Sequence, residues 1–491
     1  MTTARGPDGA DLIRRLLRRG WRWWQATRPV DPELAAALSR RWGELPDHVK
    51  TSAQLLGRRT AGCEGTHGVF PRCNLACTPC YHGQDANRVR VDGPHTVAEV
   101  DRQMTHLRAV RGPGQHAQLI GGEVTLLDPD DHAAALAAMQ RHARKPMSMT
   151  HGDFNYEYLE QLAVASDGRR RFDLLRFAGH FDSLMLGRRG RPRPATEAEL
   201  HANRREFVHK FERLETEHGV RHDLAHNMTV TPRNLDQVAD VTRACLTMGY
   251  GMLSFQPAAR VGNPSRWRES YEAVTIDAVW REIERGVGAR LPWSHLQMGD
   301  ERCNRAAYGL MAGTRWIPLL DDRNPRDLAV RDAFLDRFGG MDFDRPLAQV
   351  ITACVRVVVR RPALLPAAVG WAARLARRVG LSGALSGRPR GRTFVVHAFM
   401  DASVVQAAWR GMQDQVSSDD PAVCAAQERL RACSYGMAHP EDGRIVPACV
   451  QHSVLDQEEN RRLVHLLPTA LPAGTGASSD SPPVTGQTGR G

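Results

Sequence analysis

Three cysteines stand close together in one short segment of the chain. Cys73, Cys77 and Cys80 follow the pattern C-x3-C-x2-C within residues 71–81. Thiolates at this spacing can wrap one edge of an iron–sulfur cluster, and a cube with only three protein thiolates leaves one iron open to a small molecule. An open coordination position distinguishes reactive metal sites from closed structural ones. The spacing therefore predicts chemistry at the fourth iron.

A second segment combines two glycines with a carboxylate. Gly121, Gly122 and Glu123 directly follow the apolar run 117–120. Glycines after a strand let the backbone approach a ligand closely, and a glutamate offers its carboxylate to a cationic group. The triplet alone is a weak signal, so its meaning depends on where the fold places it relative to the cysteines.

Short apolar runs alternate with longer helical patterns between residues 60 and 265. The runs are 67–70, 117–120, 147–150, 174–178, 227–230 and 252–255, and the helical patterns include 97–110, 131–143 and 234–247. A repeated strand–helix order predicts a parallel α/β sheet. Six such units fit a partial (β/α)6 barrel, whose active site lies on the loops after the strands.

At the first and second strand ends of such a barrel, the two motifs together resemble those of the radical S-adenosylmethionine (SAM) enzyme superfamily. The resemblance implies a [4Fe-4S] cluster on Cys73, Cys77 and Cys80, and SAM contacts from Gly121, Gly122 and Glu123. It also implies one-electron cleavage of SAM to methionine and a 5′-deoxyadenosyl radical, with a reduced flavodoxin or ferredoxin-type protein as electron donor.

Other residues are candidates to line the SAM or substrate pocket. The position before the third cysteine, usually aromatic in this superfamily, is Pro79, so Tyr81 becomes the candidate for the adenine contact. Asp182, with His180 beside it, follows a later apolar run and is a candidate ribose contact. Gln256 ends another run and is a candidate pocket residue. For Asp182 and Gln256 a purely structural role remains an alternative.

More cysteines lie beyond the barrel region. Together with the preceding segment 397–401 (HAFMD), the tail is similar to the C-terminal part of tetraether-lipid synthases and related pterin-methylating radical SAM proteins. The similarity implies an auxiliary iron–sulfur cluster bound by Cys303, Cys433 and Cys449, with Cys424 or Cys63 as a fourth ligand. It also implies C–C bond formation or C-methylation on a lipid or isoprenoid-like substrate. The paired-cysteine N-terminal metal site of the tetraether synthases is missing from this sequence.

These patterns divide the chain into five predicted parts. They are an N-terminal amphipathic helical extension (1–60), the radical SAM barrel (61–265), a helical insertion facing substrate or membrane (266–390), a small cysteine-bearing auxiliary-cluster domain (391–467) and a disordered tail (468–491). The expected fold class is therefore α/β.

Composition and charge limit the class of partner. With 42% hydrophobic and 25% charged residues, the 491-residue chain has the composition of a globular protein, and its net charge of +11 favours anionic partners. Two segments, 12–27 and 350–380, interleave Trp, Leu or Val with arginines. Such segments are typical of helices that lie in a membrane interface, which predicts peripheral membrane contact.

The compartment and the alternative functions follow from what the sequence lacks. No secretory-type apolar run opens the sequence. In a reducing cytoplasm, ten cysteines are not expected to form a disulfide framework, and close spacings indicate metal or redox work. We therefore expect a cytoplasmic protein, peripheral at the inner membrane face. The alternatives are a peptide-modifying radical SAM maturase and a non-enzymatic, metal-stabilised nucleic-acid-binding protein. No finger or RNA-binding motif accompanies the charge, so nucleic acid is not an expected partner.

Overall fold

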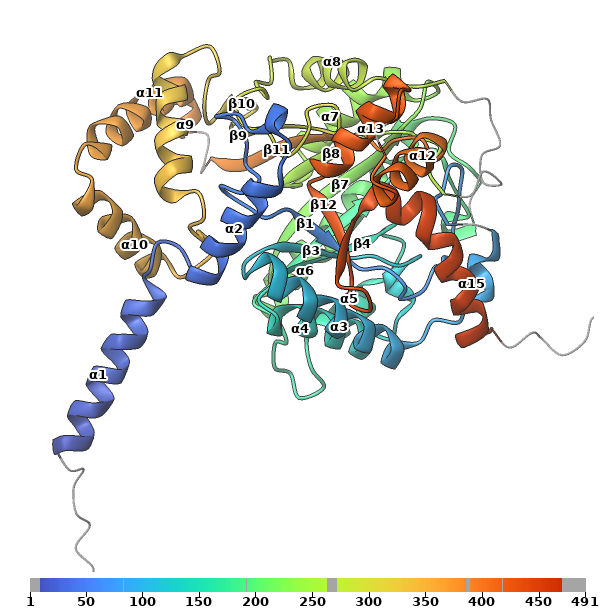
Figure 1. Cartoon of the computed structure of the whole chain (residues 1–491), viewed down its shortest axis with the longest axis horizontal. Helices are drawn as coiled ribbons and strands as arrows, with labels where there is room; N and C mark the ends of the chain where they lie inside the picture. The colour runs from blue at the N-terminus through green and yellow to red at the C-terminus, as the bar shows by residue number, and fades with distance from the viewer. Residues whose placement is uncertain are drawn as a thin grey trace, which may run out of the picture.

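The computed structural model describes residues 9–82, 84–190, 192–262, 272–385, 389–416 and 418–469. Within these residues the main sheet has eleven strands in the order β10-β9-β11-β8-β7-β5-β4-β3-β1-β12-β13 (Figure 1). Six central strands run parallel in chain order: β1 (Cys63–Gly65), β3 (His116–Leu119), β4 (Lys145–Thr150), β5 (Leu174–His180), β7 (Arg221–Val230) and β8 (Met252–Pro257). The sheet does not close on itself, so the predicted α/β partial barrel is confirmed.

The first strand differs from its prediction, whereas the other five predicted runs overlap β3, β4, β5, β7 and β8. The expected strand at 67–70 is wrong, because β1 ends at Gly65. Val69 and Phe70 are buried, which explains the apolar signal, but the backbone of His67 does not pair with a strand. Its N–H and C=O instead meet the side chain of Gln103 at 3.2 and 2.8 Å. The side-chain amide of Gln103 thus takes the hydrogen bonds that a neighbouring strand would otherwise make with His67.

A helix follows each of the six central strands. They are α3 (Gly93–Arg111), α4 (Pro129–Arg141), α5 (Tyr156–Ala163), α6 (His201–His218), α7 (Val238–Leu246) and α8 (Ile276–Val287). The helical patterns 97–110, 131–143 and 234–247 are confirmed as α3, α4 and α7, the last preceded by a short 3-10 turn. Asp92 and Asp128 cap α3 and α4 by accepting backbone N–H bonds, and a proline in each first turn fits a helix start.

The core under α6 fixes the end of β5. Phe177 of β5 and Phe211 of α6 are fully buried with ring centroids 5.0 Å apart. Beside them Arg204 forms a buried ion pair with Glu197 at 2.7 Å and donates to Phe181 O at 3.0 Å. Because Phe181 precedes Asp182, this core holds one of the predicted site residues in place.

Later segments extend both edges of the sheet. Strand β11 (Arg390–His397) pairs in parallel with β8, and β12 (Tyr435–His439) pairs in parallel with β1 at the opposite edge. Antiparallel strands complete the edges: β9 (Asn304–Ala312), β10 (Arg315–Pro318) and β13 (Arg444–Pro447). Residues 391–467 therefore supply strands on both sides of the six central strands: β11 beside β8, and β12 and β13 beside β1. Residues 266–390 supply β9 and β10 as well as helices.

The remaining helices lie around this sheet. They are α1 (Gly9–Ala26), α2 (Pro32–Glu44), α9 (Pro325–Phe338), α10 (Leu347–Arg360), α11 (Leu364–Leu385), α12 (Ala402–Gln413), α13 (Pro421–Arg431), α14 (Ala448–Val450) and α15 (Asp456–Leu466). In Figure 1, α1 projects away from the sheet on the side that carries α10 and α11. None of the described helices has the length and apolarity needed to span a bilayer. Beyond Thr469, the predicted tail 468–491 lies outside the described residues.

Candidate active site

The three predicted cluster cysteines lie on the loop that leads from β1 toward α3. Cys73, Cys77 and Cys80 are half-buried, and none forms a disulfide. The two-residue strand β2 (Ala76–Cys77) pairs with β6 (Met185–Leu186), which holds the loop against the segment that follows β5. The backbone N–H of Leu75 lies 3.3 Å from Cys73 Sγ, a contact that favours a thiolate. The loop thus presents its thiols at the carboxyl end of the barrel.

The spacing of the ligand atoms bears on the kind of metal group. Among the described residues, three ligand atoms lie within 4.8 Å of one another at two places, and neither includes a cysteine. Thiolates around a single tetrahedral ion lie close together, because each bond is only about 2.3 Å long. An iron–sulfur cluster distributes its thiolates over different irons and so spreads them apart. The three thiols of the loop are thus not gathered at one point among the described residues.

The glycine–glycine–glutamate segment packs directly on the cysteine loop. Gly122 N–H donates to Phe70 O at 2.8 Å, and Glu123 N–H donates to Arg72 O at 2.9 Å. A Cβ atom on Gly122 would lie 2.0 Å from Arg72 O, so only glycine permits this approach. At Gly122 the missing side chain thus makes room for the backbone that precedes Cys73.

Glu123 is a buried carboxylate with an ordered shell. It is 1% exposed. One oxygen accepts hydrogen bonds from Thr125 and from the Thr150 hydroxyl, and the other accepts the backbone N–H of His151 at 2.8 Å. Among the described residues it forms no direct ion pair with an arginine or a lysine. Burial lowers the pKa of His151, which favours its neutral form. Glu123 also interacts electrostatically with the guanidinium of Arg188, without a direct ion pair.

His151 connects the two motifs. Its Nδ1 accepts the backbone N–H of Asp153 at 2.9 Å, so Nε2 carries the proton and donates to Asn74 Oδ1 at 2.7 Å. Asn74 follows Cys73 directly, and Nε2 also lies 3.3 Å from Glu123 Oε2. Sequence reasoning missed Thr150, His151 and Asn74. The available signal was the position of Thr150 and His151 at the end of the predicted strand 147–150.

Asp182 and His180 form a pair at the end of β5. His180 Nε2 lies 2.6 Å from Asp182 Oδ2, and Asp182 also accepts the backbone N–H groups of Thr229 and Leu184. Burial opposes ionisation of Asp182, but His180 and these N–H groups outweigh it and lower its pKa. Asp182 is buried, whereas His180 remains one-third exposed. His180 is therefore the member of this pair that can reach a ligand.

Gln256 and Tyr81 have different surroundings. Gln256 Nε2 donates to Ser254 Oγ at 2.8 Å, while its Oε1 is buried without a partner among the described residues. A buried acceptor in this state favours a ligand that donates to it.

The Tyr81 ring packs against His452 with centroids 4.3 Å apart, and burial raises the pKa of Tyr81 well above its ordinary value. His452 belongs to the π-helical turn Gln451–Leu455, so the C-terminal segment covers the residue next to Cys80.

Thiols from distant parts of the chain converge beside β1. The backbone N–H of Cys63 donates to Ser434 O, next to Cys433, at 2.7 Å. Burial raises the pKa of Cys63 and of Cys303 to about 11 each, and the nearby Cys433 adds to both increases. Burial and then the thiols of Cys433 and Cys303 raise the pKa of Cys449. The predicted auxiliary residues are thus electrostatic neighbours, and Cys63 joins them.

Hydrogen bonds to sulfur mark the same group. Arg429 Nε donates to Cys303 Sγ at 3.1 Å, and the backbone N–H of Met400 donates to Cys449. The other fourth-ligand candidate, Cys424, lies on α13, and its thiol donates to Ser418 O at 2.6 Å. Cys433 makes a similar bond to Tyr435 O at 3.1 Å, so this bond alone does not exclude Cys424. Cys63 is the better candidate for a fourth ligand because Cys433 acts on its pKa.

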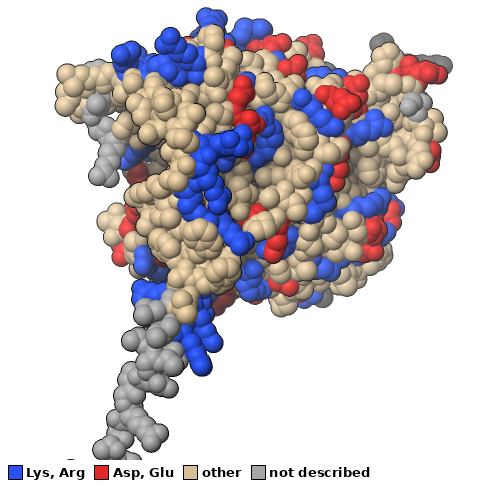
Figure 2. All heavy atoms as spheres, turned by 60° about the vertical axis from the view of Figure 1, so that its left-hand side comes forward, with Lys and Arg blue, Asp and Glu red and all other residues tan. Residues whose placement is uncertain are grey.

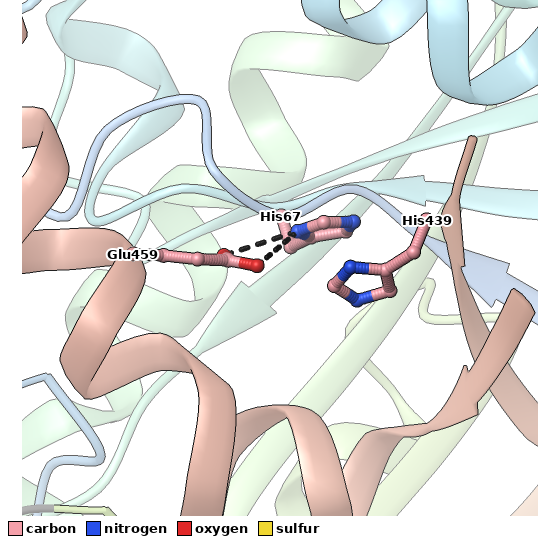
Figure 3. A group of neighbouring side chains, drawn as sticks. All are labelled: His67, His439 and Glu459. Atoms are coloured by element: carbon pink, nitrogen blue, oxygen red, sulfur yellow. Dashed lines mark hydrogen bonds and ion pairs between the residues drawn. The ribbon is translucent and has the colours of Figure 1, made fainter. Parts of the chain in front are cut away.

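A buried ion pair anchors the start of the loop that carries the cysteines (Figure 3). His67 Nδ1 lies 3.0 Å from both oxygens of Glu459 on α15, and its Nε2 lies 2.6 Å from Ala438 O. Both neighbours are acceptors, so the ring donates from both nitrogens and is an imidazolium. Burial disfavours this charge, but Glu459 and the Ala438 carbonyl outweigh it and raise the pKa of His67. The His439 ring stacks on it at 4.1 Å.

Comparisons with known proteins give matches only among solved structures. No protein-family model matches the chain, and no curated protein matches it. The structure of native anSMEcpe with bound AdoMet is 11% identical, with a TM-score of 0.29 over 45% of this chain and 57% of that one. The same protein with bound AdoMet and the Cp18Cys peptide is 11% identical, with a TM-score of 0.29 over 46% and 58%. The chain thus spans little more than half the length of these proteins.

Proposed function

We propose that this chain is a radical SAM enzyme in which Cys73, Cys77 and Cys80 hold a [4Fe-4S] cluster. The observation that carries the proposal is the backbone pairing of Gly122 and Glu123 with Phe70 and Arg72, which brings a buried carboxylate to the loop of three thiols. When bound to these residues, the cluster would supply the single electron for reductive cleavage of SAM, chemistry that can remove a hydrogen atom from an unactivated carbon. A reduced flavodoxin or ferredoxin-type protein is the proposed electron donor.

The chain's own residues supply binding and orientation. The buried carboxylate of Glu123, which makes no direct ion pair with an arginine or lysine among the described residues, favours the ammonium group of SAM, because a buried carboxylate is stabilised by a hydrogen-bonded cation. His151 and Asn74 keep this carboxylate aligned with the thiol loop. The buried Gln256 Oε1, on β8, accepts a hydrogen bond from SAM or substrate. His180, at the end of β5 and separated from β8 by β7, offers its one-third exposed ring to a ligand.

We further propose that Cys63, Cys303, Cys433 and Cys449 hold an auxiliary iron–sulfur cluster. Support comes from their mutual electrostatic influence and from the N–H groups directed at two of the sulfurs. Such hydrogen bonds tune the potential of an iron–sulfur cluster. The proposed reaction is C–C bond formation or C-methylation on a lipid or isoprenoid-like substrate, by similarity of the tail to enzymes of that kind.

The central claim is tested by SAM cleavage under reducing, anaerobic conditions. Replacing Cys73, Cys77 and Cys80 together with Ala should abolish formation of 5′-deoxyadenosine. Cys354→Ala is the matched control, because this thiol lies on α10, away from the proposed sites. Undiminished cleavage by the triple variant would refute the proposal, whereas equal loss in the control would show that the effect is not specific to the loop.

A further inference from the structure

Helix α10 presents apolar side chains on two opposite faces. Ala353 and Val357 are buried against the rest of the protein. Leu347, Ile351, Val355 and Val359, spaced four residues apart, are 73%, 53%, 52% and 73% exposed. Because residues four apart lie on one face of a helix, these side chains form a continuous outer stripe. A soluble helix ordinarily turns polar residues outward, so this stripe indicates a partner.

The next helix, α11, also exposes apolar side chains and adds charge. Leu365 and Val369 are more than half exposed. Residues 347–385, which span α10 and α11, contain six arginines and neither aspartate nor glutamate. Arg374 and Arg378 pair with Asp327 on α9. The exposed arginines of this segment are Arg360, Arg361 and Arg377.

Helix α1 meets α10 through Arg356, and Arg345, just before α10, also donates to Ala26 O at the end of α1 at 3.1 Å. The guanidinium of Arg356, on α10, lies 3.6 Å from the ring centroid of Trp24 and donates to Trp24 O and Thr27 Oγ1 at 3.0 Å. This contact holds α1 beside α10 and leaves Leu17, Trp21 and Trp23 exposed. Arginines stand between these side chains, and Figure 2 shows Lys and Arg gathered over this side of the molecule.

We propose that α1, α10 and α11 form one docking surface for an anionic lipid bilayer, a partner beyond the proposed chemistry. Exposed Trp, Leu and Val side chains enter the acyl boundary, while arginines pair with phosphate groups of the lipids. Charge argues against a second copy of the chain as the occupant. A two-fold interface would place the same patch on both subunits and bring like-charged arginines together. Not every residue of the two predicted segments, 12–27 and 350–380, faces outward, because Thr27 and Val357 are buried.

The first test uses the full-length protein and sedimentation with vesicles. We expect binding to mixed phosphatidylglycerol–phosphatidylcholine vesicles, little binding to phosphatidylcholine alone, and weaker binding as salt is added, because salt screens charges over about 8–10 Å. The triple variant Ile351→Glu, Val355→Glu, Val359→Glu should bind more than about tenfold more weakly. Leu466→Glu, at an equally exposed position on α15, is the matched control and should bind as the wild type does.

The second test asks whether the helices act as one surface. Arg356→Ala and Arg360→Ala each remove one positive charge from α10, but of these two arginines only Arg356 holds α1. Arg356→Ala should therefore weaken vesicle binding more than Arg360→Ala does. Equal losses would refute the shared surface. The membrane proposal is wrong if the wild type does not sediment with anionic vesicles at low salt. It is also wrong if the chain forms a salt-resistant dimer that the triple variant abolishes. Neither outcome affects the proposed SAM chemistry.

Discussion

Replacing Gly122 with Ala should separate the two motifs that build the candidate site. The added Cβ atom would lie 2.0 Å from Arg72 O and 2.2 Å from Pro71 O, and both obstacles are backbone atoms that cannot rotate away. Overpacking of this kind costs about 1–3 kcal/mol. Moving the loops apart also loses the bonds from Gly122 N–H and Glu123 N–H, at about 1 kcal/mol each. We therefore expect a loss of roughly 3–5 kcal/mol in the free energy of unfolding.

The neighbouring glycine provides the matched control. A Cβ on Gly121 would meet Phe70 O at 3.0 Å and the Phe70 ring at 3.1 Å, contacts that a shift of a few tenths of an ångström relieves. Gly121→Ala should therefore cost less than about 2 kcal/mol. Urea unfolding of the anaerobically purified proteins measures both changes, and iron content per chain reports whether the thiol loop still holds its cluster.

The result that refutes this reasoning is specific. If Gly122→Ala unfolds at the wild-type urea concentration and retains its iron, the two loops are not packed as described. If both variants lose the same stability, the short contact with Arg72 is not the cause.

Three further predictions concern the auxiliary thiols and two buried ion pairs. Cys63→Ala should lower the iron retained by the Cys73, Cys77, Cys80 triple-Ala variant, whereas Cys424→Ala should not; equal iron contents would remove Cys63 from the ligand set. The pKa of His67 is raised above its ordinary value of 6.5, so its stabilising contribution is complete below the unfolded pKa and is lost as pH rises through the folded pKa. Glu459→Gln should therefore destabilise the protein more in acidic than in alkaline urea titrations, and a pH-independent difference would contradict the imidazolium assignment. Glu197→Ala leaves Arg204 buried without its carboxylate and should cost about 3–5 kcal/mol, against less than about 1 kcal/mol for Asp240→Ala at the exposed pair with Arg243; similar thermal shifts would contradict this difference.

Local sequence patterns determined most of the barrel. Apolar side chains on strands that are buried on both faces give a continuous apolar run in the sequence. Five predicted runs therefore lie in or overlap parallel strands: 117–120, 147–150, 174–178, 227–230 and 252–255. Capping residues such as Asp92 and Asp128 mark two of the helix starts. The order of these elements was enough to predict an open α/β barrel. It also placed the cysteine loop and the segment that contains Glu123 at the same edge of the sheet.

Tertiary structure decided which residues meet. The sequence around His67 is apolar enough for a strand, but the Gln103 side chain on α3 takes its backbone hydrogen bonds. The link from Glu123 through His151 to Asn74 joins three separate segments, and no spacing within any of them predicts it. Cys63 approaches Cys433 because β12 pairs beside β1, across most of the length of the chain. The periodicity of apolar residues in the sequence indicates which side of a helix or strand is buried. Pairing between distant strands depends on the completed sheet, so only the folded chain reveals these partners.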